Sequence, residues 1–251
     1  MMNKPNGVEV IVKRKSKLIY REGDKLYKSF DETFSKSNVL NESLTQARIE
    51  ETGLNIPKII EVSVVNDKCT IVMEYIEGKT LEQLMAESPE KEEEYLNLFV
   101  DIQLEIHTKR SPLLTKFKDK MTDKILKSDL DASTRYDLGM RWKEMPSHKC
   151  VLHCDFNPSN VIVANNGKNY IIDWSHASQG HAAADAAKTY LIFELEGKKQ
   201  TADNYLRIFC KKAKMDETFV RTWIPLIAAA QLIKGNQEDR DILMKYVNSV
   251  E

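Results

Sequence analysis

The sequence has almost no net charge and no long hydrophobic run. Its 251 residues include 37 Lys and Arg against 38 Asp and Glu, which leaves a net charge of −1. Such a balanced charge argues against non-specific binding to nucleic acid. The longest apolar run, from Ile224 to Ala230, is too short to cross a bilayer. We therefore expect neither a nucleic-acid partner nor a membrane partner.

Cysteine is scarce, and a secretion signal is missing from the first residues. The four cysteines are Cys69, Cys150, Cys154 and Cys210. Their spacing fits no disulfide framework, and the first residues lack the apolar core of a signal peptide. These absences predict a reducing, cytoplasmic setting. Cys150 and Cys154 lie near His148 and His153, but one Cys-x3-Cys pair without a second is a weak metal signal.

What is present divides into a strand-rich part and a helical part. Alternating and β-branched runs predict strands at 8–12, 18–21, 25–30, 56–62 and 69–75, with a helix at 38–52. A capping box at 80–83 predicts the start of a short helix. Later apolar periodicity predicts helices at 89–107, 182–195, 202–212, 217–234 and 239–247, with 108–148 also mostly helical. We expect an α+β fold with a strand-rich lobe over 1–77 and a helical lobe over 78–251.

The stretch from Val151 to Trp174 carries the clearest chemical signal. Two short apolar runs, 161–163 and 170–172, flank a turn rich in Asn and Gly and predict a hairpin. Asp155 and Asn160 precede the first run, and Asp173 follows the second. This pattern fits phosphoryl transfer, with Asp155 as the base for a hydroxyl and with Asn160 and Asp173 as oxygen ligands of Mg²⁺.

Other interpretations of these residues remain open from the sequence. Asp155 taken alone also suits an ordinary turn, and His153 suits packing and backbone hydrogen bonding better than catalysis. A metal hydrolase that uses His153 and Asp155 would instead require a tightly bound transition metal.

Lys28, in the third predicted strand, is a candidate for binding a nucleotide phosphate. An ammonium group suits this role when a helix carboxylate holds it in place, and Glu42 in the following helix is the best partner. The alternative is an ordinary surface lysine on an exposed strand.

The run from His153 to Asn160, followed by Ile171–Trp174, resembles the catalytic and metal loops of the aminoglycoside phosphotransferase and choline kinase superfamily. The resemblance implies a two-lobed protein-kinase-like fold with ATP and Mg²⁺ as cofactors. It implies that the backbone of Glu74 and Ile76 meets adenine and that Met73 lines the nucleotide pocket. The Asp185-Ala186-Ala187 run resembles a helix start of the superfamily, in which the Asp braces the catalytic loop from beneath.

The chain departs from these patterns in three places. Cys154 stands where a Gly commonly follows the His, and Arg14-Lys15-Ser16-Lys17 stands where protein kinases have a glycine-rich loop. Asp-Trp-Ser replaces the Asp-Phe-Gly of protein kinases, which makes a protein substrate less favoured.

We therefore expect an ATP-dependent phosphotransferase that acts on the hydroxyl of a small molecule. The alternative is a catalytically silent nucleotide-binding module of the same fold. The presence of all four of Lys28, Asp155, Asn160 and Asp173 favours the active enzyme over the silent module. Lysines at 198, 199, 211, 212 and 214 disfavour a polycationic acceptor such as an aminoglycoside.

Overall fold

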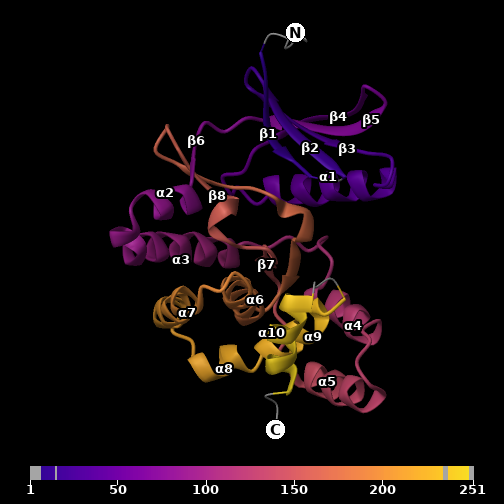
Figure 1. The fold of residues 1–251 in the computed structure, drawn as a ribbon, viewed down its shortest axis with the longest axis vertical. Helices are drawn as coiled ribbons and strands as arrows, with labels where there is room; N and C mark the ends of the chain where they lie inside the picture. The colour runs from indigo at the N-terminus through magenta and orange to yellow at the C-terminus, as the bar shows by residue number, and fades with distance from the viewer. Residues whose placement is uncertain (1–6, 15, 234–236, 249–251) are drawn as a thin grey trace. The chain divides into compact units, whose positions relative to one another are not determined.

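The computed structural model describes residues 7–14, 16–233 and 237–248, and the chain forms two compact units (Figure 1). The first unit combines the chain up to residue 84 with residues 159–176. The second combines residues 85–158 with those from 177 onward. This division differs from the expected single cut after residue 77. It differs because β6 (Gly78–Thr80) pairs with β8 (Val161–Ala164), which joins the candidate metal hairpin to the first unit.

The first unit is built on a five-stranded antiparallel sheet with one helix against it (Figure 1). Its elements are β1 (Val8–Lys13), β2 (Lys17–Glu22), β3 (Lys25–Phe30), α1 (Lys36–Glu50), β4 (Ile59–Val65) and β5 (Lys68–Glu74), in sheet order β1-β2-β3-β5-β4. The Ser35 hydroxyl caps α1 by accepting the Asn38 amide proton at 3.3 Å. Phe30, Val39 and Ile71 pack together between sheet and helix, so apolar burial fixes α1 on this face.

A smaller sheet in the first unit holds the predicted hairpin. Its strands are β6, β8 and β9 (Asn169–Ile171) in the order β6-β8-β9. Gly78 is required at the contact, because an added Cβ would clash with the carbonyl oxygen of Val163. The register sets Val161 opposite Ile171, and the Ile172 amide donates to the Asn160 carbonyl at 3.0 Å. Both ends of the hairpin are therefore held side by side where the candidate ligands lie.

The second unit is mainly helical. Its helices are α2 (Leu81–Glu87), shared with the first unit, α3 (Glu92–Thr108), α4 (Phe117–Leu126), α5 (Ala132–Glu144), α6 (Ala182–Leu195), α7 (Lys199–Ala213), α8 (Glu217–Arg221), α9 (Ile224–Gln231) and α10 (Gln237–Asn248). Two short strands, β7 (Cys150–Leu152) and β10 (Ser178–Gly180), pair antiparallel. Phe99 and Tyr205 join α3 to α7 in the buried core, with ring centroids 5.9 Å apart.

Two sequence expectations on helices have different outcomes. The helix predicted at 182–195 is present with those bounds as α6. The helix predicted at 217–234 is instead broken into α8 and α9, and its expected last residue, Lys234, lies outside the described residues. Pro225 lies at the first turn of α9, where its missing amide proton is tolerated; inside a longer helix it would remove a hydrogen bond.

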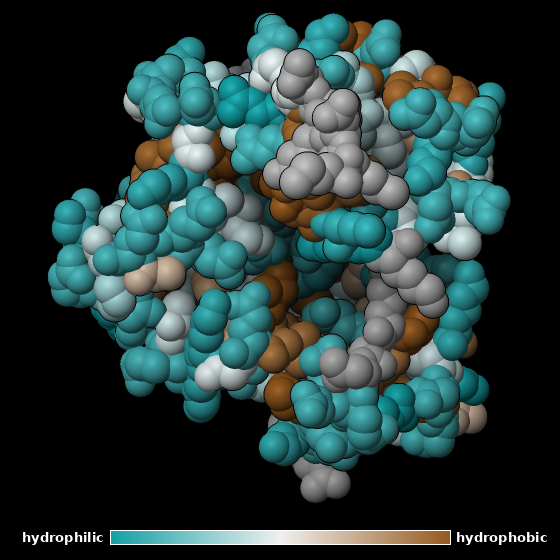
Figure 2. Space-filling view, turned by 45° about the horizontal axis from the view of Figure 1, so that its top comes forward, coloured by the Kyte–Doolittle hydropathy of each residue, from teal (hydrophilic) through white to brown (hydrophobic). Residues whose placement is uncertain are grey.

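Hydrophilic side chains predominate on the molecular face drawn in Figure 2. This agrees with a chain in which 30% of the residues are charged. None of the helices in the described part of the chain has the length and apolar character needed to cross a bilayer.

The His181→Asn substitution is expected to flatten the dependence of stability on pH between about 4 and 6.5. His181 caps α6, because its Nδ1 accepts the Ala183 amide proton at 3.1 Å. Burial, then repulsion from His148 and His107, lowers the pKa of His181 from 6.5 to about 4. The unfolded chain thus takes up a proton at a pH at which the folded chain does not, so stability falls as pH decreases through this window.

An Asn at position 181 keeps a side-chain oxygen that can cap α6, and it removes the group that titrates. Urea unfolding at a series of pH values measures the effect, with His176→Asn as the control that retains the slope. An unchanged slope in the His181→Asn variant would contradict the expectation.

Candidate active site

Lys28 of β3 lies between two carboxylates of the first unit. Its Nζ forms an ion pair with Glu42 Oε1 of α1, and a second with Asp173 Oδ1 at 3.2 Å. Antiparallel pairing sets Lys28 opposite Ile71 of β5, in the middle of the sheet. The sequence prediction that Glu42 partners Lys28 is confirmed by this contact. A surface lysine is excluded, because only 6% of Lys28 is exposed.

The surroundings of Lys28 keep it charged. Burial alone would lower its pKa, but the carboxylates of Asp173 and Glu42 outweigh burial and raise the pKa above its usual value. Lys17 on the neighbouring strand is affected in the opposite direction, since burial and the Lys28 charge lower its pKa. The result is one fixed ammonium group beside the Asp173 carboxylate.

The Glu42→Gln substitution is expected to destabilise the protein by about 1–3 kcal/mol. It removes one of the two negative charges that compensate the buried Lys28, while Asp173 still pairs with it. Urea unfolding measures the loss. Glu51→Gln, at the exposed end of the same helix, is the matched control and should change stability by less than about 0.5 kcal/mol. Equal effects of the two substitutions would show that the ion pair between Lys28 and Glu42 does not contribute to the free energy of unfolding.

Asn160 and Asp173 lie at adjacent ends of the β8–β9 hairpin. Asn160 is 8% exposed and directly precedes β8, while Asp173 follows β9 by two residues. The Ser175 hydroxyl donates to Asp173 Oδ1 at 3.2 Å, which orients the carboxylate. One amide oxygen and one carboxylate fit Mg²⁺, which binds hard oxygen ligands and retains waters or phosphate oxygens in its other positions.

Two non-glycine residues of the candidate loops adopt the left-handed conformation. Cys154 has φ of 63° and Asp173 has φ of 61°. Such backbone costs about 1–3 kcal/mol per residue and persists where surrounding contacts hold it. At Cys154 these contacts are the Asp185 carboxylate, which accepts the amide proton at 2.7 Å, and the Lys188 ammonium, which donates to the carbonyl. Cys154 is thus accommodated where glycine would be unstrained.

Asp155 lies in the second unit, on the loop that follows β7. Its amide donates to His153 Nδ1 at 3.3 Å, and the Asn157 side-chain amide donates to its carbonyl at 3.0 Å. His153 is fully buried and packs edge-on against Phe156, with ring centroids 5.7 Å apart. His153 therefore has the packing and backbone-binding role that the sequence favoured.

Asp185 of α6 holds this loop. Besides the Cys154 amide, its carboxylate accepts protons from the His153 amide at 3.3 Å and from His107 Nε2 at 3.0 Å. Burial alone would raise its pKa, but hydrogen bonding and charge from His107, together with the neighbouring groups, lower the pKa below its usual value. Asp185 thus remains a carboxylate although only 1% of it is exposed.

The sequence prediction missed the groups around Asp185. Gln103 and His107 belong to α3, and the Gln103 side chain donates to Thr189 Oγ1 at 3.2 Å. The Tyr205 hydroxyl donates to Gln103 Oε1 at 2.5 Å. The available signal was the spacing: Gln103 and His107 are four residues apart and interrupt the apolar stripe of α3.

The three residues expected near adenine lie at the end of β5 and just beyond it. Met73 is 7% exposed and packs in the sheet core. The Glu74 amide donates to the Lys58 carbonyl at 3.0 Å, and Ile76 lies in the segment between β5 and β6. In the basic turn between β1 and β2, the Arg14 amide donates to the Lys17 carbonyl at 2.8 Å. Lys15 lies outside the described residues.

The first unit therefore contains every predicted site residue except Asp155. Within the described residues, no group of three or more His, Cys, Asp or Glu is arranged to hold a metal ion. Because the hydrolase alternative depended on His153 as a ligand, the burial of His153 and its bond to the Asp155 amide argue against that alternative.

Comparison with known proteins places the chain in a family. Residues 36–221 match the family described as the phosphotransferase enzyme family. The match spans more than half of the chain, and the chain belongs to this family. A relative, KEOPS complex subunit Bud32 of Pyrococcus abyssi, is 35% identical over 85 residues, which are 34% of this chain and 36% of the relative. The match thus spans about a third of that relative's length.

Solved structures share the fold over nearly the whole chain. A thermostable mutant of aminoglycoside phosphotransferase APH(4)-Ia is 14% identical, with a TM-score of 0.70 over 97% of this chain and 93% of that one. APH(2'')-Ib is 19% identical, with a TM-score of 0.64 over 97% and 91%. A choline/ethanolamine kinase family protein from Mesorhizobium loti is 16% identical, with a TM-score of 0.57 over 98% and 82%. The predicted α+β, protein-kinase-like fold is confirmed.

Proposed function

We propose that the protein transfers the γ-phosphate of ATP to a hydroxyl of a small molecule, with Mg²⁺ as cofactor. The observation that carries this proposal is the buried Lys28, held between Glu42 and Asp173 in the unit that also contains Asn160. A fixed ammonium beside a candidate metal ligand suits the phosphates of a metal-bound nucleotide.

Each predicted site residue would have its own role in the reaction. Asp155 would accept the proton of the attacking hydroxyl, which needs an ionised carboxylate at hydrogen-bond distance. Lys28 would bind phosphate oxygens, and Asn160 and Asp173 would hold Mg²⁺. When bound, Mg²⁺ neutralises charge that develops on the phosphate oxygens. The backbone of Glu74 and Ile76 would contact adenine, and Met73 would line the nucleotide pocket.

The choice of ATP is supported by what related folds bind. A mutant of APH(4)-Ia was crystallised with AMP-PNP and hygromycin B, and APH(2'')-Ib was crystallised with ADP. The solved structure of a mutant of aminoglycoside 2'-phosphotransferase-IIIa is a GDP complex, so a test of this chain needs both ATP and GTP.

The lysines near the end of the chain are weaker evidence on the acceptor than their number suggested. Lys198 pairs with Glu196 at 2.8 Å, and Lys212 pairs with Asp101 at 2.8 Å. Lys199 lies 3.4 Å from Asp203. Because these charges are compensated, a cationic acceptor belongs in the test beside neutral ones.

The deciding experiment supplies ATP or GTP labelled at the γ-phosphate, with Mg²⁺ and a panel of aminoglycosides, amino alcohols and sugars. Transfer of label to at least one acceptor, abolished by EDTA, is the expected result. Binding of ATP with Mg²⁺ in a thermal-shift assay but no transfer to any acceptor would favour the silent nucleotide-binding module. Neither binding nor transfer would refute the proposal.

A further inference from the structure

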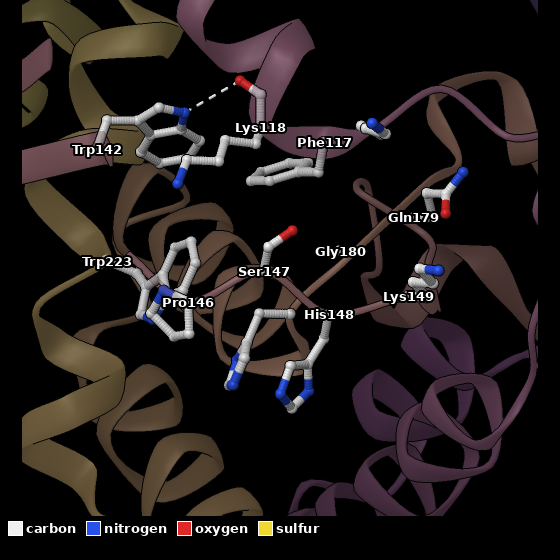
Figure 3. Close-up of a pocket in the computed structure, with 12 residues that line it drawn as sticks. Phe117, Lys118, Trp142, Pro146, Ser147, His148, Lys149, Gln179, Gly180 and Trp223 are labelled. Carbon is white, nitrogen blue, oxygen red and sulfur yellow. Dashed lines mark hydrogen bonds between the residues drawn. The ribbon is translucent and has the colours of Figure 1, made fainter. Parts of the chain in front are cut away.

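The second unit contains a cavity of about 150 Å³ that none of the proposed phosphotransfer residues lines. It lies among the start of α4, the segment 146–149, the end of β10, and Trp223 (Figure 3). Lys149 borders it and directly precedes β7, whereas His153 begins the catalytic loop beyond the other end of that strand. Four residues of extended chain span about 13 Å, so the cavity is separate from Asp155.

The rim of the cavity is fixed by hydrogen bonds. Lys118 Nζ donates to the carbonyls of Lys143 and Met145, at 2.9 and 3.0 Å. The Trp142 indole donates to the Lys118 carbonyl at 3.0 Å, the dashed contact in Figure 3. Gly180 packs tightly against β7, because a Cβ added at this position would lie only 2.8 Å from Leu152 Cδ1. The cavity is thus part of the packed structure.

Its charged lining is cationic, with neutral Ser147 and Gln179 beside it. Lys116, Lys118 and Lys149 line it together with His148 and His181, and no Asp or Glu does. His181 Nδ1 accepts the Ala183 amide proton and the low pKa keeps the ring neutral, so its proton is on Nε2. Such a lining repels cations and favours a ligand rich in acceptor oxygens.

One lining donor lacks a partner. Trp223 is 3% exposed, and its buried Nε1 has no hydrogen-bond acceptor among the described residues. A buried donor left unpaired costs about 1–3 kcal/mol. The two other indole groups are satisfied, Trp142 by Lys118 and Trp174 by Ile171. Trp223, a lining residue, therefore differs from the two other tryptophans in having an unpaired indole donor.

The apolar lining is aromatic. Trp142 and Trp223 meet edge to face with centroids 5.8 Å apart, and Phe117 lies 6.1 Å from Trp142. Ring faces of this kind favour an aromatic guest. A cavity of about 150 Å³ holds a benzene-sized group.

We propose that this cavity, which we call the aryl-anion site, binds a small molecule made of one aromatic ring and a carboxylate or phosphate. The ring packs against Trp142 and Trp223, and the anionic group lies toward Lys116 and Lys149. This assignment does not depend on the phosphotransfer reaction.

The test uses benzoate as the probe and the indole N–H signals of ¹⁵N-labelled protein as the readout. The three tryptophans give three signals, which single Trp→Phe variants assign. Benzoate should shift the Trp223 and Trp142 signals saturably, with a Kd of about 1 mM, and should leave Trp174 unchanged. Benzyl alcohol and benzylamine, which have the ring without the negative charge, should bind at least about threefold more weakly.

The double variant Lys116→Gln/Lys149→Gln should weaken benzoate binding by about threefold or more, because both ammonium groups are exposed and removable without unfolding. Lys127→Gln, an exposed lysine at the end of α4 outside the cavity, is the matched control and should bind as the parent does. The proposal is overturned if no tryptophan signal shifts, if benzylamine binds as well as benzoate, or if the double variant and control behave alike.

Discussion

Replacement of Asp155 with Asn is expected to lower the rate of phosphoryl transfer by about 100- to 10,000-fold. Asn has nearly the same shape as Asp but cannot accept the hydroxyl proton. Two contacts that hold residue 155 use its backbone and are available to Asn as well: the amide donates to His153 Nδ1, and the carbonyl accepts from the Asn157 side chain. The loop conformation should therefore survive the substitution, and the loss should be confined to the chemical step.

The first measurement is the rate of label transfer from ATP to the acceptor found in the screen. The second is nucleotide binding, monitored by a thermal-shift assay. Binding of ATP with Mg²⁺ should remain within about threefold of the parent, since Lys28, Asn160 and Asp173 are unchanged. Asp137→Asn, an exposed carboxylate on α5, is the matched control. A transfer rate within about threefold of the parent in the Asp155→Asn variant would exclude Asp155 as the base.

The parts of the fold that follow from local pattern could be predicted from the sequence. The hairpin of β8 and β9 is recognisable because two apolar runs flank an Asn- and Gly-rich turn, and that pattern fixes where Asn160 and Asp173 emerge. The pairing of Lys28 with Glu42 could also be inferred, because a buried cation requires a carboxylate and α1 supplies one nearby.

The parts that depend on distant contacts could not be predicted from pattern. β7 and β10 have three residues each, which is too short for a periodicity to appear, and they pair across 25 intervening residues. The grouping of residues 159–176 with the first unit likewise follows from the pairing of β6 with β8. Asp185 was placed by resemblance alone, and its contact with His107 needs α3 and α6 to pack first.

Asp185→Ala should destabilise the protein by about 3–5 kcal/mol. Its carboxylate accepts protons from His107 Nε2 and from the amides of His153 and Cys154, and all of these donors are buried. Alanine leaves each without its partner, and unpaired buried donors cost about 1–3 kcal/mol each. The Cys154 amide matters most, because it helps to hold that residue at a φ of 63°.

Urea unfolding of Asp185→Ala measures this loss, and Asp123→Ala is the matched control. Asp123 of α4 pairs with Lys127 at the surface at 2.8 Å, so its removal should cost less than about 1 kcal/mol. A double-mutant cycle then isolates the His107 contact. His107→Leu should destabilise the Asp185→Ala variant less than it destabilises the parent, because the His107 donor is already unpaired there. Additive losses would mean that the hydrogen bond between His107 and Asp185 does not stabilise the folded protein.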